Sequence, residues 1–458
     1  MMKIIDFLNG IVWGPPLLIL LVGTGIFLTF RLAFLQFRML PYALKLAFGP
    51  KQQDKKSEGD ISHFQALMTA LSATIGTGNI AGVATAVVIG GPGAVLWMWM
   101  SALFGMITKY AEGLLAVKFR VKNERGEMSG GPMYYIERGL GLKWLGVLFA
   151  IFGSLAAFGI GNIVQANELA SAMKATFSIP PLITGLILTF LTGLVVLGGI
   201  KSIGRITSII VPFMAAFYVL GGLVIIILNF KLVPDAIGLI FSDAFTGQAV
   251  AGGAIGTVIR YGVARGVFSN EAGMGSAPIA AAAAKTDYPA RQAFVSMTGV
   301  FLDTIVVCAI TGITLVMANM YTGGLDGAAL TSASFGHFLG TYGEWIVSIG
   351  LILFAYSTVL GWSYYGEKCF SYLFKDSKIT VVLYRAVFTI VVLFGALSQS
   401  SKFVWGLADL MNGLMAIPNL IALLGLSGIV IAETHHFLEI KRKEDQLRKT
   451  TTSGSISK

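Results

Sequence analysis

The sequence predicts an all-α polytopic membrane protein with about eleven transmembrane helices, and three observations lead to this class. Of the 458 residues, 55% are hydrophobic and only 12% are charged, which is about half the charged share of a soluble domain. The mean hydropathy is +0.78, and several apolar runs reach the roughly 20 residues that a helix needs to cross a bilayer. The chain also contains 56 glycines, an excess that suits close helix packing and discontinuous helices.

The predicted spans follow one another with polar connectors between them. They cover residues 12–35, 63–90, 94–117, 143–174, 181–199, 205–229, 248–284, 290–320, 343–373, 380–398 and 403–433. The first span is expected to be retained, because residues 1–10 lack the basic region and small-residue cleavage site of a signal peptide. Residues 129–136 are expected to form a short surface helix, and the polar tail from Glu439 to Lys458 is expected to be mobile.

The basic residues predict which side of the membrane each connector faces. They gather in alternate connectors, as Lys51, Lys55, Lys56, Lys118, Arg120, Lys122, Arg125, Lys201, Arg205, Lys285, Arg291, Lys375, Lys378, Lys441, Arg442 and Lys443. The opposite connectors carry chiefly Lys174, Lys231 and Lys402. By the positive-inside rule, the N-terminus is expected outside and the C-terminus in the cytoplasm. The membrane is expected to be the plasma membrane of the cell. The net charge of +10 then reflects loops near anionic lipid, and no nucleic-acid partner is expected.

The second predicted span contains an unusual interruption between Leu71 and Thr85. Its middle holds three glycines and four polar side chains, namely Gly76, Gly78, Gly82, Ser72, Thr74, Thr77 and Asn79. Glycine disfavours helix, and polar groups at mid-membrane are costly unless they meet a ligand or water. Taken alone, the stretch fits a broken helix at a binding site and a tightly packed small-residue helix equally well.

A second interruption, from Arg265 to Pro278, resembles the first. Residues 79–85 and 270–276 align, and each interruption begins a set of five spans. An odd number of spans per repeat gives the two halves opposite topology, and paired broken helices in inverted repeats point to a transport site. The predicted organisation is a leading helix with a cytoplasmic connector (1–61), two inverted repeats (62–229 and 230–435) and a cytoplasmic tail (436–458).

Several motifs resemble those of the alanine or glycine:cation symporter family. They are Gly76–Ala86, Gly90–Ala94, Trp97–Trp99, Thr108–Glu112, Ser129–Tyr135 and Ser269–Pro278, and the resemblance extends over about residues 10–435. It implies a leucine-transporter-like fold with one leading helix and a five-plus-five inverted repeat. It also implies sodium-driven uptake of alanine or glycine by alternating access, with sodium as coupling ion and no other cofactor.

The resemblance also implies a set of substrate-binding residues. They are Thr74, Gly76, Thr77, Gly78, Asn79, Gln165, Phe268, Ser269, Asn270 and Trp362. Backbone at Gly76–Gly78 is expected to face the substrate carboxylate, because unwound glycine backbone and half-helix N-termini supply donors. The carbonyls near Thr74 and Phe268, with Gln165, are expected to face the ammonium. Phe268 and Trp362 are expected to limit side-chain size, although an interhelical hydrogen bond for Gln165 and simple packing for the aromatics remain alternatives.

For sodium, the resemblance implies oxygen ligands from the first and eighth core helices. These are the carbonyls of Ser72 and Ile75 with Ser357, Thr358 and a carbonyl around Phe354, since sodium prefers hard oxygen ligands. The alternative is that the two hydroxyls bond back to their own helix. Proton coupling through a lysine of the fifth core helix is the competing mechanism. Residues 208–224 of that helix contain no cation, so sodium is favoured.

The remaining polar residues predict ion pairs within the membrane and argue against an enzyme. Lys109 and Glu112 have helical spacing and can pair on one face of a helix. Structural or gating pairs are expected for most of Glu168, Arg260, Arg265, Glu271, Asp303 and Asp409. The four histidines and the two cysteines, Cys308 and Cys369, form no catalytic or metal-binding motif, so an enzyme is not expected. An ion channel remains a weaker alternative.

Overall fold

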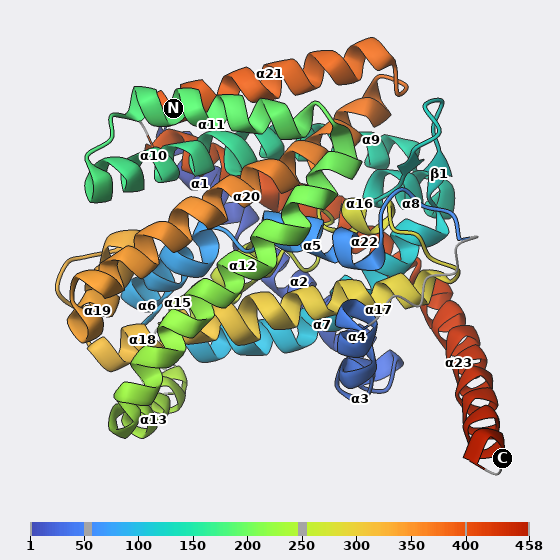
Figure 1. Ribbon diagram of the computed structural model, residues 1–458, viewed down its shortest axis with the longest axis horizontal. Coiled ribbons are helices and arrows are strands. Elements are labelled where there is room, and N and C mark those ends of the chain that lie inside the picture. The colour runs from blue at the N-terminus through green and yellow to red at the C-terminus, as the bar shows by residue number, and fades with distance from the viewer. Residues whose placement is uncertain (1, 50–56, 246–253, 399–400, 457–458) are drawn as a thin grey trace.

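The computed structural model describes residues 2–49, 57–245, 254–398 and 401–456. In these ranges the regular structure is helical except for one antiparallel hairpin (Figure 1), formed by β1 (Val121–Lys122) and β2 (Met128–Ser129). The predicted all-α class is therefore correct. Lys51, Lys55 and Lys56, and the first residues of the predicted span 248–284, lie outside the described residues.

The chain begins with helices that lead into the core. They are α1 (Met2–Val12), α2 (Pro15–Arg31), α3 (Leu35–Arg38) and α4 (Leu40–Phe48). The first apolar span is Met2–Arg31, so it begins earlier than the predicted residue 12. Helix α1 is part of this span, and it packs against α22, where Asn9 Nδ2 donates to the Gly406 carbonyl at 2.7 Å and Trp13 Nε1 donates to the Asp409 carbonyl at 2.9 Å.

The part of the chain predicted as the first repeat contains one bent span. Its elements are α5 (His63–Thr74), η1 (Gly78–Gly82, a π-helical turn), α6 (Val83–Gly90), α7 (Ala94–Lys118), α8 (Pro132–Leu140), α9 (Lys143–Phe158), η2 (Gly159–Ile163, also π-helical), α10 (Val164–Phe177), α11 (Pro181–Val196) and α12 (Gly199–Leu228). The Ser62 side chain and Gln65 form a capping box that starts α5. The predicted helix near 129–136 exists as α8, but it is not a surface helix, because Pro132–Ile136 are buried.

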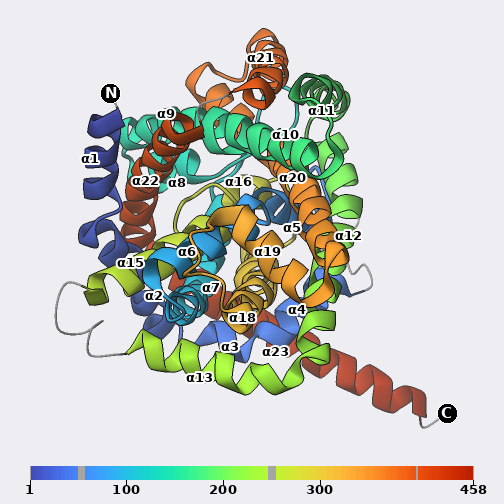
Figure 2. The same ribbon diagram turned by 90° about the vertical axis from the view of Figure 1, so that its left-hand side faces the viewer.

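The part predicted as the second repeat is also interrupted near its start. Its elements are η3 (Phe230–Leu232, a 3-10 turn), α13 (Val233–Ala244), α15 (Ala254–Asn270), α16 (Pro278–Ala281), α17 (Pro289–Val300), η4 (Phe301–Cys308, π-helical), α18 (Ala309–Ala318), α19 (Gly327–Leu339), α20 (Thr341–Leu373), α21 (Lys378–Leu397) and α22 (Ser401–Gly425). Helix α23 (Ser427–Ile456) then projects from the body (Figures 1 and 2). The tail expected to be mobile is thus a continuation of this helix. Helices α13 and α19 were not expected.

The predicted number of spans is only partly matched. Seven helices in the described ranges are long and apolar enough to cross a bilayer, or eight if α5 and η1–α6, which bend by 54°, form one broken span. Helices α7, α11 and α15 occupy the other three predicted ranges but do not meet these criteria. The total of about eleven stays a prediction.

The two interruptions lie in the interior of the molecule. Helix α5 contacts α12, α16, α17 and α20, and α15 contacts η1. Figure 2 shows α6, α7 and α19 enclosed by other helices, among them α10, α12 and α22. Consecutive residues of α5 from Leu71 to Thr74 are all buried. This arrangement brings the first break next to the second.

Candidate functional site

The first break lies between Thr74 and the start of η1. Ile75 leaves the helical conformation, with φ −75° and ψ 92°. Asn79 Oδ1 accepts a hydrogen bond from the Gly76 N–H at 2.8 Å, so the break is stabilised by one of its own side chains. The predicted interruption is therefore a real bend in the backbone, as a discontinuous helix requires.

The second break occupies residues 271–277, between α15 and α16. Glu271, Gly273 and Gly275 have positive φ values of 55°, 86° and 84°, a conformation that favours glycine and is strained for Glu271. The Ser276 hydroxyl donates to Glu271 Oε2 at 2.6 Å. The glycines thus allow a tight turn, and Glu271 is held in an uncommon conformation beside the site.

A small cavity of about 20 Å³ lies where the two breaks meet. It is lined by Ala73, Thr74, Gly76, Thr77, Gly78, Ile160, Gln165, Phe268, Glu271, Thr358, Trp362 and Asn412. Seven of the ten predicted substrate residues are in this lining, and Thr358 comes from the predicted sodium set. The cavity therefore joins α5, η1, α10, α15, α20 and α22 at one point.

Three predicted substrate residues do not reach this cavity. Asn79 Nδ2 donates to Asp303 Oδ1 at 2.7 Å, and the Ser269 hydroxyl donates to Asp303 Oδ2 at 2.8 Å. Asn270 Nδ2 donates to the hydroxyl of Thr304 at 3.0 Å. Asn79, Ser269 and Asn270 therefore connect both breaks to η4 behind the cavity.

Four lining residues belong to neither the predicted substrate set nor the predicted sodium set: Ala73, Ile160, Glu271 and Asn412. Glu271 was noted only as an intramembrane charge and assigned to pairing, although its position inside the second interruption was a signal for the site. Asn412 is an amide within a predicted apolar span, which is also a signal. Nothing in the sequence distinguishes Ala73 and Ile160 from other apolar residues.

The cavity contains buried oxygens that have no hydrogen-bond donor. Gln165 Nε2 donates to the Thr77 hydroxyl at 3.2 Å and to the Ile160 carbonyl at 3.1 Å. In the described part of the chain, Gln165 Oε1 and Asn412 Oδ1 are buried without a partner. Because unpaired buried acceptors are costly, these two oxygens are suited to a ligand that donates hydrogen bonds.

The predicted sodium residues come together at the contact between α5 and α20. The Ser357 hydroxyl donates to the Ser72 carbonyl at 3.3 Å and to the Phe354 carbonyl at 2.9 Å. The Thr358 hydroxyl also donates to the Phe354 carbonyl, at 2.9 Å. Ser72, Ile75, Phe354, Ser357 and Thr358 are all buried. Both hydroxyls bond back to their own helix, but each oxygen retains lone pairs that can face a cation.

Phe268 separates the cavity from a larger vestibule of about 680 Å³. Gly78 and Phe268 line both spaces. The Arg265 guanidinium carbon lies 5.5 Å from the centre of the Phe268 ring, and the rings of Phe268 and Trp405 are 6.1 Å apart. Four carboxylic residues also line the vestibule: Asp6, Glu168, Asp326 and Asp409. Gly78 and Phe268 therefore lie at the boundary between the cavity and the vestibule.

Lys109 and Glu112, which helical spacing allows to pair, form no ion pair within 4 Å and bind different partners. The Lys109 ammonium donates to the Asn270 carbonyl at 2.8 Å. Glu112 Oε1 accepts hydrogen bonds from the Gly275 N–H at 3.0 Å and from Asn419 Nδ2 at 2.6 Å. The helical spacing of the two residues does not reveal these partners, because the backbone groups that bind them belong to the second break.

A family model for the sodium:alanine symporter family matches residues 1–452 of the chain. The chain belongs to the sodium:alanine symporter family. Membership confirms the predicted family and the predicted class of sodium-coupled symporter. The family and its relatives are transporters rather than enzymes, and with the apolar helices they make this chain a multi-pass membrane protein.

Individual relatives agree with this assignment. The sodium/alanine symporter AgcS of Methanococcus maripaludis is 61% identical over 450 residues, which are 96% of this chain and 98% of that protein. The probable sodium/glutamine symporter GlnT of Bacillus subtilis is 39% identical over 441 residues, 96% and 91% of the two chains. The crystal structure of MhsT in complex with L-phenylalanine has a TM-score of 0.58 at 16% identity and covers 82% of this chain and 98% of that one. This structural likeness confirms the leucine-transporter-like fold.

Proposed function

We propose that this symporter takes up small neutral amino acids, alanine and glycine, together with sodium by alternating access. The observation that supports this best is the cavity of about 20 Å³ between the two breaks, which combines unpaired acceptors with a tight apolar wall. A family relative that is a sodium/alanine symporter shares 61% identity with the chain. The cavity would accommodate the amino acid by a modest widening as Phe268 moves.

The ammonium group of the substrate meets the acceptor side of the cavity. Gln165 Oε1 and Asn412 Oδ1 have no donor among the described residues, and the Glu271 side chain lines the same space. An ammonium carries three donors and a positive charge, so two amide oxygens and a carboxylate match it in number and sign.

The carboxylate group meets the start of the second half of the broken helix. The Thr77 hydroxyl and the backbone at Gly78 are there, where η1 and α6 begin and the first N–H groups of a helix lack intrahelical partners. The Gly76 N–H is bonded to Asn79, so we assign the carboxylate to Thr77 and Gly78, with Asn79 in a supporting position.

The size limit comes from aromatic and aliphatic side chains around the substrate carbon. Phe268 and Trp362 lie on the wall with Ile160 and Ala73. Trp362 is buried against Gly161, where an added Cβ would lie 2.1 Å from the Trp362 Cβ. This close packing leaves room for a hydrogen or methyl side chain and disfavours leucine.

Sodium binds between α5 and α20, with the carbonyls of Ser72, Ile75 and Phe354 and the hydroxyls of Ser357 and Thr358 as oxygen ligands. The alternative of a lysine that replaces sodium finds no support in α12, since Lys201 and Arg205 near its start are exposed. We assign the vestibule beyond Phe268 to the outside and the hairpin, α8 and α23 to the cytoplasm, as the positive-inside rule requires.

The direct test is uptake of radiolabelled alanine into proteoliposomes with and without an inward sodium gradient. We expect saturable, sodium-dependent uptake that glycine competes for and leucine does not. Gln165→Ala should raise the KM for alanine about tenfold, because it removes an acceptor for a charged group. Uptake that is independent of sodium and driven by a proton gradient would contradict sodium coupling. Steady conductance in a planar bilayer would indicate a channel.

The sodium site is tested separately through its hydroxyls. Thr358→Val keeps the shape of the side chain and removes the oxygen, so the sodium concentration for half-maximal uptake should rise about tenfold. Thr314→Val is the matched control, because Thr314 is a buried threonine of α18 that lies away from the α5–α20 contact. Equal sodium dependence in the two variants would remove Thr358 from the ligand set.

A further inference from the structure

Lys109 is a lysine fully buried inside a predicted membrane span. It lies in the middle of α7 with 3% of its surface exposed. No carboxylate in the described residues lies within 4 Å of its ammonium, and its hydrogen bond is to the Asn270 carbonyl, at 2.8 Å. A buried intramembrane charge is costly and indicates a specific role. That role is not sodium binding, because a cation would be repelled by the ammonium.

The partner of Lys109 defines one end of the second break. Asn270 is the last residue of α15, a helix of 17 residues, and the carbonyls at a helix C-terminus lack intrahelical donors and carry partial negative charge. The ammonium satisfies such a carbonyl directly before Glu271, which lines the substrate cavity. The Lys109 ammonium therefore caps the C-terminal end of α15 at the point where the break begins.

Glu112, one turn further along α7, binds the other side of the same break. Its Oε1 accepts the Gly275 N–H and Asn419 Nδ2, and Asn419 Nδ2 also donates to the Gly273 carbonyl at 2.8 Å. The Tyr135 hydroxyl of α8 donates to Asn419 Oδ1. Residues 271–275 of this break are thus held from α7 at both ends and braced by α22 and α8.

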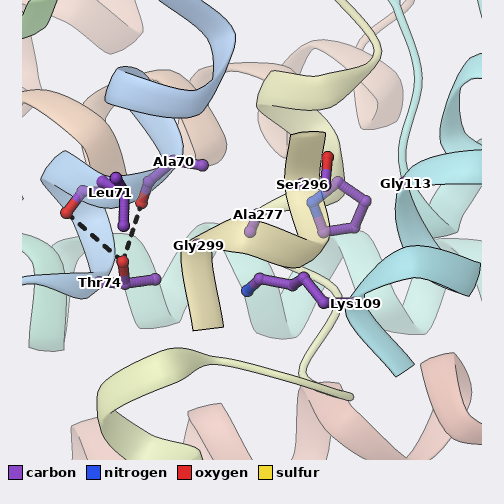
Figure 3. A pocket seen from close by; sticks show the side chains of 9 residues that line it. Ala70, Leu71, Thr74, Lys109, Gly113, Ala277, Ser296 and Gly299 are labelled. Carbon is purple, nitrogen blue, oxygen red and sulfur yellow. Dashed lines mark hydrogen bonds between the residues drawn. The ribbon is translucent and has the colours of Figure 1, made fainter. Parts of the chain in front are cut away.

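Lys109 also approaches the first break. A cavity of about 10 Å³, with room for about one water molecule, is lined by Lys109 together with Thr74 of α5 and Ala277 and Pro278 of the second break. Figure 3 shows the Lys109 side chain extending from α7 with its nitrogen directed toward the side of the cavity where Thr74 lies. Thr74 lines the substrate cavity as well.

We propose that Lys109 and Glu112 are positioning residues for transport, which hold the second break so that Glu271 and Phe268 face the substrate. Lys109 acts through the Asn270 carbonyl and Glu112 acts through the Gly275 N–H, and neither touches the substrate. The Lys109 ammonium and the Glu112 carboxylate therefore bind opposite ends of one loop and do not bind each other. The expected effect of these residues on the affinity for alanine rests on the proposed function. Their expected effect on the conformation of the loop is independent of it.

The loop is tested without substrate by hydrogen–deuterium exchange of the peptide around 268–280 in purified full-length protein. We expect Lys109→Met and Glu112→Leu to speed exchange there about tenfold or more, since each removes a charge-assisted hydrogen bond. Lys109→Arg and Glu112→Gln keep a donor or an acceptor and should stay near the wild type. Lys118→Met, at the exposed end of the same helix in an ion pair with Glu433, is the control. Unchanged exchange in Lys109→Met would overturn the proposal.

Transport kinetics then separate positioning from general stability. Lys109→Met should raise the KM for alanine about tenfold with a Vmax within about threefold of the wild type, and Lys109→Arg should restore most of the affinity. A fall in Vmax with unchanged KM would show that Lys109 only stabilises the fold, and would also overturn the proposal. Absence of alanine uptake in the wild type and in Lys118→Met would contradict the proposed substrate, and the exchange experiment would still decide the role of Lys109.

Discussion

Gln165 and Asn412 reach the same cavity from different helices, α10 and α22, and each has one oxygen without a donor. Gln165 was predicted as a site residue, and its alternative role, an interhelical hydrogen bond, is also present through the Thr77 hydroxyl. The amide nitrogen links α10 to the first break, and the amide oxygen is left without a donor, as the proposed binding of an ammonium group requires. Asn412 was not predicted, because a single asparagine in a helix does not show which cavity it faces.

Gly161 provides a residue-scale prediction about substrate size. An added Cβ would lie 2.1 Å from the Trp362 Cβ, so Gly161→Ala must displace Trp362 from the cavity wall. We expect alanine affinity to fall about tenfold or more, while serine or larger amino acids compete better than in the wild type, because overpacking shifts the aromatic ring. Competition uptake assays measure both effects.

The control for this prediction is Gly23→Ala in α2, where an added Cβ meets no atom within 4 Å. This variant should transport alanine like the wild type. If Gly161→Ala keeps the affinity and selectivity of the wild type, Trp362 does not limit the size of the substrate.

At the scale of elements, the two breaks were predictable and their supports were not. Glycine and polar clusters in apolar runs marked both interruptions, and the structure has a 54° bend at the first and positive φ values in the second. The supports come from distant elements: Asp303 of η4 binds Asn79 and Ser269, and α7 binds residues on both sides of Glu271. The helical spacing of Lys109 and Glu112 suggested that they can pair. Their partners are backbone groups of the second break, and sequence spacing contains no information about such a neighbour.

The β1–β2 hairpin provides an element-scale prediction about pH. Glu127, outside the predicted spans, lies 3.0 Å from Arg125 and 3.2 Å from Lys368 of α20. Burial would raise the pKa of the Glu127 carboxyl, but Lys368 and Arg125 outweigh burial and lower it below its ordinary value of 4.5. Because the pKa is lower in the folded state, the ionised carboxylate stabilises the fold above about pH 4.5, and this contribution is lost as the pH falls further.

The measurement is the melting temperature of the wild type and of Glu127→Gln between pH 7 and pH 3.5. At pH 7 the variant should melt about 1–2 °C lower, a small difference because the side chain is partly exposed. The difference should shrink as the pH falls below 4.5. A difference that is constant over the whole range would show that the ion pairs do not stabilise the hairpin.

At the scale of the whole molecule, the alternation of basic connectors predicts the membrane orientation. Cys308 and Cys369 are buried, so after their replacement by alanine a new cysteine at an exposed position is the sole reactive thiol. We expect Lys231→Cys to react with a membrane-impermeant maleimide in intact cells. Lys443→Cys should react only after the membrane is opened, because the predicted orientation places α23 in the cytoplasm. Labelling of both positions in intact cells would contradict the predicted orientation.

The sequence by itself determined the class of protein, the two interruptions and the family. These features depend on composition, on hydrophobic run length and on local glycine and polar patterns, all of which are local along the chain. Only the tertiary structure decided which side chains share a cavity. Glu271 and Asn412 are 141 positions apart and still line one space, whereas Ser269 and Asn270, directly beside Phe268, turn away from it toward η4. The direction of a side chain depends on the helices that pack around it, and a linear pattern does not contain that information.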